Sequence, residues 1–285
     1  MYINLKEVTQ KAKELNYTVG AFNTHNLEML PEMIRAAKEK GAPIIIQTSV
    51  STAKYIGYKV LVEVCKLLAE TELVDVTLHL DHAKNFDDIK DAIDNGYSSV
   101  MFDGSSLPFK ENIMKTATVV EYAHARGVSV EGELGIIGGT EDGHSIDSEK
   151  YMYTKPEDAV EFIKQTGVDA LAVAIGTNHG QYKSKTNVRL DLLKEINNVV
   201  DVPLVIHGGT GVKEEDIPKL INNGIRKFNV GTELLVGWTK TAKEKFGETA
   251  LDNSLRNNIM PCNETVKNIV KHKIEIFMNK NQPIR

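Results

Sequence analysis

Eight short apolar runs, separated by stretches with helical periodicity, recur along the chain, and this repetition most limits the possible fold. The runs span residues 18–23 (TVGAFN), 43–48 (PIIIQT), 75–82 (DVTLHLDH), 98–104 (SSVMFDG), 128–135 (VSVEGELG), 169–176 (DALAVAIG), 203–209 (PLVIHGG) and 225–231 (IRKFNVG). Most are almost continuously apolar, which is typical of parallel strands covered by helices. Between them, apolar residues such as Leu27, Leu30 and Ile34 form helical stripes. The alternation predicts an α/β fold, a (β/α)₈ or TIM barrel.

A doubly wound open sheet is the competing architecture. A doubly wound sheet requires a reversal of strand order and a glycine-rich first turn, and the segment GAFNTHN (20–26) does not supply such a turn. Barrels of this size are often single domains, so we expect one domain over residues 1–285. The segment after Pro261 is predicted to add a C-terminal helix.

Charge and cysteine content limit the partners and the compartment. The net charge is −5 and no basic block stands out, which argues against a nucleic-acid partner. Cys65 and Cys262 match no metal or redox spacing, which favours a reducing compartment. The N-terminus lacks the apolar core of a signal peptide, and no run approaches the length of a membrane span. We therefore expect a soluble cytoplasmic protein.

Polar side chains gather at the downstream ends of the apolar runs from the third onward. In chain order they are Asp81 and His82, Asp103, Glu133, His179, His207 and Asn229. In a barrel, these ends converge on one rim, where the active site lies. The pattern therefore predicts a single site at that rim.

Three of these residues are histidines, and they suggest a metal. Neutral imidazole suits a zinc-like ion, and three protein ligands leave one position open for a substrate. A single histidine would be explained more simply as a core or loop residue whose ring nitrogens are hydrogen-bonded within the protein. Asp103 and Glu133 are predicted to form a second cation site or to orient the histidines. His79 and Glu131 are expected to be hydrogen-bonded interior residues.

Asp81 and His82 are neighbours, and a regular strand would point them to opposite faces. If both side chains reach the rim, the strand must be broken at this point. We therefore expect an irregularity there.

Two glycine clusters, HGGTG (207–211) and NVGT (229–232), follow the seventh and eighth runs. Glycines serve tight turns, but they also expose backbone N–H groups, and helix N-termini favour anions. The loops after strands seven and eight are frequent phosphate sites in such barrels. The pair of clusters predicts a phosphorylated small-molecule substrate.

The longest stretch predicted to be irregular covers residues 135–153, with several glycines and acids and few apolar residues. Loops of this length tend to be functional or disordered. It is compatible with a lid that carries Glu141 or Asp142 over the site, and equally with a solvated acidic loop.

These segments together resemble the class II, metal-dependent ketose-bisphosphate aldolases. The segments LHLDH (78–82), SVMFDGS (99–105), VEGELGIIGG (130–139), GTNHGQY (176–182), HGGTG (207–211) and NVGTEL (229–234) are similar to that family's motifs and stand in the same order. The resemblance covers almost the whole chain.

The resemblance implies roles for individual residues. His82, His179 and His207 would bind the catalytic zinc, Asp81 would be the catalytic acid/base, and Glu141 would transfer a proton from a mobile loop. Asp103 and Glu133 would belong to an alternative or second metal site. A monovalent cation, Na⁺ or K⁺, would bind near the substrate phosphate. Dihydroxyacetone phosphate would be held by Gly180, Gly208, Gly209, Thr210, Asn229, Val230, Gly231 and Thr232.

The resemblance also implies a lyase that cleaves fructose 1,6-bisphosphate, with tagatose 1,6-bisphosphate as the alternative. AVAIGTNHGQY (172–182) is similar to the tagatose branch and HGGTG to the fructose branch, while faint similarities point to inositol-catabolic phospho-ketose aldolases. The family is commonly dimeric or tetrameric, which implies a homo-oligomer, and tagatose members can need a partner subunit. Two rival functions are a Schiff-base aldolase that uses Lys227 and a non-catalytic sugar-phosphate-binding subunit.

Overall fold

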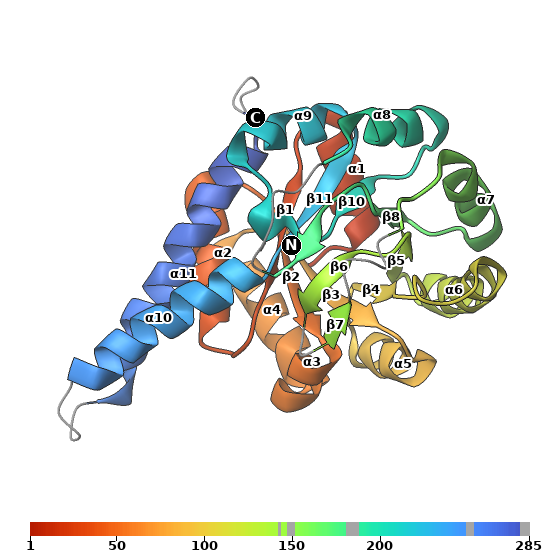
Figure 1. Cartoon of the computed structure of the whole chain (residues 1–285). Coiled ribbons are helices and arrows are strands. Elements are labelled where there is room, and N and C mark those ends of the chain that lie inside the picture. The colour runs from red at the N-terminus through yellow and green to blue at the C-terminus, as the bar shows by residue number, and fades with distance from the viewer. Residues whose placement is uncertain (142–143, 147–151, 181–187, 249–253, 280–285) are drawn as a thin grey trace.

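The computed structural model describes residues 1–141, 144–146, 152–180, 188–248 and 254–279. Eight parallel strands close into a barrel (Figure 1), and β1 pairs with β11 from Val19↔Lys227 to Phe22↔Val230. The strands of the barrel are β1 (Val19–Asn23), β2 (Ile44–Ser49), β3 (Val76–Ala83), β4 (Ser99–Phe102), β5 (Ser129–Leu134), β8 (Ala170–Val173), β10 (Leu204–Ile206) and β11 (Ile225–Val230). All eight strands begin within one residue of the start of a predicted run, so the predicted (β/α)₈ barrel is confirmed.

Helices surround the barrel, and their apolar stripes pack on its outer face. They are α2 (Met29–Lys40), α3 (Val50–Ile56), α4 (Tyr58–Glu72), α5 (Phe86–Asn95), α6 (Phe109–His124), α7 (Pro156–Thr166), α8 (Leu190–Val199), α9 (Ile217–Asn222), α10 (Thr232–Glu248) and α11 (Leu255–Phe277). Outward-facing strand residues such as Ile46, Leu78 and Val130 form one apolar core with these helices. Among the described helices, none has the length and hydropathy that a membrane span needs.

A helix that the sequence analysis did not predict, α1 (Leu5–Glu14), closes the amino-terminal end of the barrel. It begins with a capping box in which Asn4 and Glu7 satisfy each other's backbone N–H groups. Leu5 and Val8 pack with the inward-facing Val19 in a second apolar core. Because this end is sealed by apolar contacts, the polar interior faces the carboxyl-terminal end.

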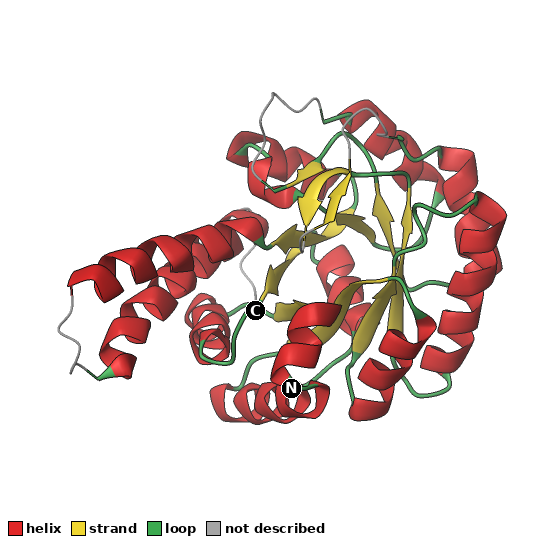
Figure 2. Cartoon of the chain, turned by 60° about the horizontal axis from the view of Figure 1, so that its bottom comes forward, coloured by secondary structure: helices red, strands yellow, loops and turns green. Residues whose placement is uncertain are grey.

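The C-terminal helix α11 packs along α10, and the pair extends away from the barrel (Figures 1 and 2). The added helix is confirmed, but its predicted start after Pro261 is wrong. The helix begins at Leu255 and contains the proline. Proline has no N–H group to donate to the carbonyl of the residue four positions earlier in a helix. That residue, Asn257, is exposed to solvent, so the helix tolerates the proline.

Part of the stretch predicted to be irregular is regular. β6 (Gly138–Glu141) and β7 (His144–Ile146) form an antiparallel hairpin, and β6 also pairs with β9 (Asn178–His179). The dipeptide between the paired Glu141 and His144 is Asp-Gly, a sequence that favours two-residue hairpins and explains the pairing. This small sheet lies at the carboxyl-terminal end of the barrel (Figure 2).

Candidate metal centre and active site

The end of β3 is irregular, as the neighbouring Asp81 and His82 predicted. His82 has a positive φ of 49°, a left-handed conformation that is uncommon outside glycine. The register of β3 against β4 shifts between Leu80↔Val100 and Ala83↔Phe102, which places one extra residue on β3. This bulge lets consecutive side chains turn toward the same site.

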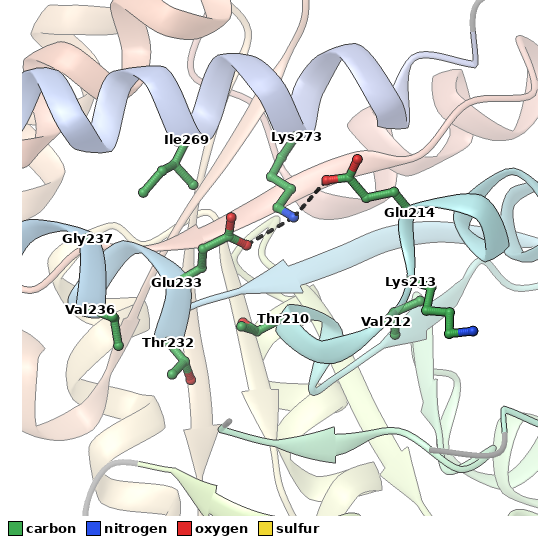
Figure 3. A pocket seen from close by; sticks show the side chains of 10 residues that line it. All are labelled: Thr210, Val212, Lys213, Glu214, Thr232, Glu233, Val236, Gly237, Ile269 and Lys273. Carbon is green, nitrogen blue, oxygen red and sulfur yellow. Dashed lines mark ion pairs between the residues drawn. The ribbon is translucent and has the colours of Figure 1, made fainter. Parts of the chain in front are cut away.

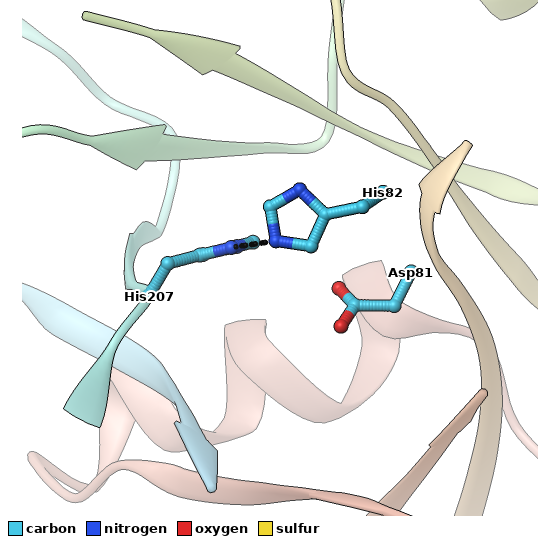
Figure 4. A group of neighbouring side chains, drawn as sticks. All are labelled: Asp81, His82 and His207. Carbon is cyan, nitrogen blue, oxygen red and sulfur yellow. Dashed lines mark hydrogen bonds between the residues drawn. The ribbon is translucent and has the colours of Figure 1, made fainter. Parts of the chain in front are cut away.

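His82 and His207 meet above the barrel, although they are 125 positions apart in the chain. Nε2 of His82 lies 2.8 Å from Nδ1 of His207, and the two rings are nearly perpendicular at 89°. Asp81 lies beside the pair (Figure 4), and ligand atoms of all three residues lie within 4.8 Å of one another. The structure thus brings together three of the predicted site residues.

Each histidine turns its other ring nitrogen toward a carboxylate. Nε2 of His207 lies 2.8 Å from Oε1 of Glu131, and Nδ1 of His82 lies 3.2 Å from Oδ2 of Asp103. Metal-binding histidines almost always donate their second N–H group to such a partner, which fixes the tautomer and the ring orientation. The arrangement leaves the facing nitrogens as the two candidate ligand atoms.

The electrostatics favour a neutral His207 beside ionised acids. Burial, together with the positive charge of His82, lowers the pKa of His207. Burial alone would raise the pKa of Asp103, but the hydrogen bond and charge of His82 lower it below its ordinary value. Glu131 is also buried, yet the charge of Lys227 and the hydrogen bond from His207 hold its pKa low. Neutral imidazole is the form that binds a metal.

This donor set fits a zinc-like ion. Two imidazole nitrogens that share one tetrahedral zinc ion at about 2.0–2.1 Å would lie about 3.3 Å apart. The observed separation is 2.8 Å, so the rings would need to part by about half an ångström. A second group, His82, Asp103 and Glu133, also places its ligand atoms within 4.8 Å of one another. Oε2 of Glu133 lies 3.8 Å from Nδ1 of both histidines, so Asp103 and Glu133 are placed both to contact the histidine rings and to join His82 in a second cation site.

Three side-chain amides surround Asp81. Nε2 of Gln47 donates to Oδ2 at 3.0 Å, and Nδ2 of Asn23 donates to the same oxygen at 3.3 Å. Nδ2 of Asn229 lies 3.5 Å from Oδ1. The sequence analysis did not select Asn23 or Gln47. Both stand at the downstream ends of the first two strands, so the same strand-end rule would have found them.

His179 and Glu141 are brought near each other through the backbone. β6 pairs with β9 through Gly139↔His179, two residues from Glu141. The side chains of both residues lie outside the described part of the structure. Asp142, the alternative to Glu141, also lies outside the described residues.

The two glycine clusters lie side by side. Gly209–Gly211 forms a short 3₁₀ turn after β10, and Thr232 begins α10 directly after β11. Thr210 and Thr232 line one pocket of about 500 Å³ (Figure 3), with Lys273 held between Glu214 and Glu233.

Three glycines of the predicted phosphate site, one of them outside the two clusters, have a structural requirement of their own. Gly208 and Gly180 have positive φ angles of 66° and 81°. A Cβ at Gly231 would lie 2.8 Å from Oδ1 of Asn23. The side chain of Val230 is buried in the outer core, so only its backbone could reach a ligand.

His79, Glu131 and Lys227 are completely buried inside the barrel. Nδ1 of His79 lies 2.7 Å from Oγ of Ser99, and burial, together with the charge of Lys227, lowers its pKa to about 3. Nζ of Lys227 lies 3.0 Å from Oε2 of Glu131 and donates to Oδ1 of Asn229 at 2.7 Å. His79 and Glu131 are thus hydrogen-bonded interior residues, as predicted.

The fold and the site define a (β/α)₈ barrel with a histidine–carboxylate cluster at its carboxyl-terminal rim. The family model described as fructose-bisphosphate aldolase class-II matches residues 3–282. A fructose-bisphosphate aldolase of Geobacillus stearothermophilus is 40% identical over 278 residues, which cover 96% of each chain. The chain belongs to the class-II fructose-bisphosphate aldolase family.

Solved structures agree with this assignment. The YdjI aldolase from Escherichia coli K12 superposes with a TM-score of 0.86 at 32% identity, over 99% of each chain. A structure described as a putative fructose-1,6-biphosphate aldolase from Coccidioides immitis gives 0.88 at 29% identity, over 98% of this chain and 97% of that one. The predicted family and the predicted aldolase-type lyase function are confirmed, and the family is metal-dependent.

Proposed function

We propose that this protein cleaves fructose 1,6-bisphosphate reversibly into dihydroxyacetone phosphate and glyceraldehyde 3-phosphate, with zinc as its metal. The observation that carries the proposal is the contact between His82 and His207 beside Asp81, at the rim where a barrel enzyme binds its substrate. The name of the Geobacillus relative favours fructose over tagatose bisphosphate.

Nε2 of His82 and Nδ1 of His207 would hold the metal, with His179 as the third ligand implied by the family motif. Bound there, zinc would act as a Lewis acid toward the ketone and hydroxyl oxygens of the substrate. Asp103 and Glu131 hold the two histidine rings from behind. Glu133 would either support the same rings or, with Asp103, offer an alternative metal position.

Asp81 would move the hydroxyl proton when the bond between carbons three and four breaks. Its carboxylate accepts N–H groups from Gln47, Asn23 and Asn229, which hold it in one orientation toward the site. Glu141 would protonate the carbon of the dihydroxyacetone phosphate half, which is left with negative charge. The two carboxylates therefore serve different proton transfers.

The glycine clusters would bind the phosphate of dihydroxyacetone phosphate. Backbone N–H groups at Gly208, Gly209 and Thr210, together with Gly180, would donate hydrogen bonds to the phosphate. The N–H groups of Gly231 and Thr232 would bind it from the start of α10, because a helix N-terminus favours an anion. Asn229 and the backbone of Val230 would complete this side. A monovalent cation, Na⁺ or K⁺, would bind close to the phosphate.

We further propose that residues 1–285 form one domain, that the protein assembles as a homodimer or homotetramer, and that it acts in the cytoplasm. Light scattering at micromolar concentration tests the assembly, and a monomeric mass would contradict it.

A cleavage assay tests the main proposal. Fructose 1,6-bisphosphate and tagatose 1,6-bisphosphate are compared, each with and without a metal chelator, and zinc is then added back. We expect preferential cleavage of the fructose substrate, loss of activity with chelator and recovery with zinc. Chelator-resistant cleavage, or covalent modification by borohydride in the presence of substrate, would favour the Schiff-base alternative, and no cleavage would favour the non-catalytic one.

A further inference from the structure

We infer that Lys227 is a positioning residue that holds the metal ligand His207 and the acid/base Asp81 in a fixed relation to each other. The inference rests on the proposed function. It follows from an unbroken chain of polar contacts through the interior of the barrel, with Lys227 at its centre.

One branch of the chain runs from Lys227 to His207. Nζ of Lys227 lies 3.0 Å from Oε2 of Glu131, and Oε1 of the same carboxylate lies 2.8 Å from Nε2 of His207. An ionised carboxylate only accepts hydrogen bonds, so Nε2 of His207 carries the hydrogen. The lone pair of His207 is then on Nδ1, the atom that faces His82. The ion pair thus selects the tautomer that can bind a metal.

The other branch runs from Lys227 to Asp81. Nζ donates to Oδ1 of Asn229 at 2.7 Å, and the two residues share a strand face because they are two positions apart on β11. This contact fixes which end of the amide faces the ammonium group. The Nδ2 end therefore faces Asp81, 3.5 Å from Oδ1.

The environment of Lys227 argues against two other roles. A Schiff-base lysine needs a neutral amine that the substrate can reach, whereas this ammonium group is not exposed and contacts Glu131 and Asn229. A buried ion pair is also weak evidence for a purely stabilising role, because desolvation offsets much of its attraction. His79 is the other group beside the pair, with Nε2 3.6 Å from Oε2 of Glu131, and it is held separately by Ser99.

The test compares Lys227→Met with the double variant Lys227→Met/Glu131→Gln. Arg226→Met is the matched control, because Arg226 is a buried cation on the same strand that bonds the carbonyls of Ile221 and Ile225 and the side chain of Asn16, away from the site. The measurements are the zinc dissociation constant by competition with a chelating dye, steady-state kinetics and thermal unfolding.

We expect Lys227→Met to weaken zinc binding about 10- to 100-fold, the usual effect of losing an outer partner of a metal ligand. In the double variant, no charge is left unpaired, and the carbonyl oxygen of the new side-chain amide accepts the Nε2–H group of His207. Zinc affinity should then return to within about threefold of wild type. The kcat should stay low, because Asn229 still lacks the hydrogen bond from Lys227 that orients its amide toward Asp81. Arg226→Met should lower the melting temperature and leave zinc affinity and kcat unchanged.

Wild-type zinc affinity in Lys227→Met would overturn the inference. If that variant does not fold, zinc binding by the double variant is the test. Weakened zinc binding in the double variant would show that Lys227 does not act through Glu131. Borohydride trapping at Lys227 would also overturn it. The wild-type protein tests the proposed function separately, since chelator-resistant cleavage there would refute the metal mechanism whatever the variants do.

Discussion

Gln47 donates a hydrogen bond from Nε2 to Oδ2 of Asp81 at 3.0 Å, and both side chains are buried inside the barrel. The same Nε2 also donates to Oδ1 of Asn23 at 2.8 Å, and Nδ2 of Asn23 donates to Oδ2 of Asp81. Asp81 is therefore held by amides from the first two strands of the barrel as well as by its own strand.

Replacing Gln47 by leucine should lower kcat at least about tenfold. The variant keeps the volume but removes a hydrogen bond to a charged group, which contributes about 1.5–3 kcal/mol. Steady-state cleavage kinetics measure the effect. Thr48→Val is the matched control, because Thr48 bonds Tyr97 on the outer side of the barrel at 2.9 Å. It should cost about 1 kcal/mol of stability and spare kcat. Wild-type kcat in Gln47→Leu would contradict a role in holding Asp81.

Replacing His207 by alanine should remove both the metal and the activity while the barrel stays folded. Glu131 keeps its ion pair with Lys227 in this variant, so no buried charge loses its counterion. Elemental analysis should find about one zinc-like ion per wild-type chain and almost none in the variant. Far-UV circular dichroism should be unchanged. Metal at wild-type stoichiometry in the variant would rule out His207 as a ligand.

The fold and the rim of the barrel were accessible from the sequence because both depend on short patterns. A continuous apolar run predicts a parallel strand, and the polar residue that ends it must lie at the carboxyl-terminal rim. Asn23 and Gln47 obey the same rule and were missed only because the first two runs were not included. The hairpin of β6 and β7 also had a local signal, Asp-Gly at 142–143.

Other parts of the site were not accessible in this way. The contact between Glu131 and Lys227 joins strands that are not neighbours in the barrel, and no spacing encodes it. The irregularity at His82 was expected from the requirement that two neighbouring residues face one site. Its form, an extra residue with a positive φ, depends on pairing with β4. Sequence patterns specify which face a side chain occupies, but packing across the barrel determines which nitrogen of a ring points inward.

Gly209→Ala should destabilise the protein and raise the KM for fructose 1,6-bisphosphate. An added Cβ would lie 2.1 Å from the ring of the buried Phe228 and 2.7 Å from the carbonyl oxygen of Asn229. Overpacking of this kind costs about 1–3 kcal/mol and would shift the turn proposed to bind phosphate. Gly247→Ala, near the end of α10 with nothing within 4 Å of the new Cβ, should instead raise stability slightly. An unchanged KM in Gly209→Ala would show that the turn at Gly209–Gly211 does not bind the substrate phosphate.

Both cysteines should resist thiol reagents in the native protein. Burial raises the pKa of Cys65 to about 12 and also raises the pKa of Cys262. At pH 8 the thiolate fraction of Cys65 is then on the order of one in ten thousand, and only the thiolate reacts. A chromogenic disulfide reagent should label about two thiols per chain in urea and almost none without it. Rapid labelling of the native protein would show that α4, which carries Cys65, or α11, which carries Cys262, opens readily.

The last prediction separates the two proposed proton-transfer groups. Asp81 lies on a barrel strand and is held by three amides, whereas Glu141 ends β6, in a small sheet outside the barrel. We therefore expect Asp81 to act on the hydroxyl during cleavage, and Glu141 to reach the carbon only when this segment closes over bound substrate. Glu141→Ala should still bind metal and cleave the bond, but it should protonate the dihydroxyacetone phosphate carbon slowly.

Washout of deuterium from labelled dihydroxyacetone phosphate, run beside single-turnover cleavage, distinguishes the two steps. Washout should fall far more than cleavage in Glu141→Ala, and Asp142→Ala should leave both rates close to wild type. Equal losses in the two steps would mean that Glu141 only positions the substrate. Unchanged washout in Glu141→Ala, with slow washout in Asp142→Ala, would assign the proton transfer to the neighbouring acid instead.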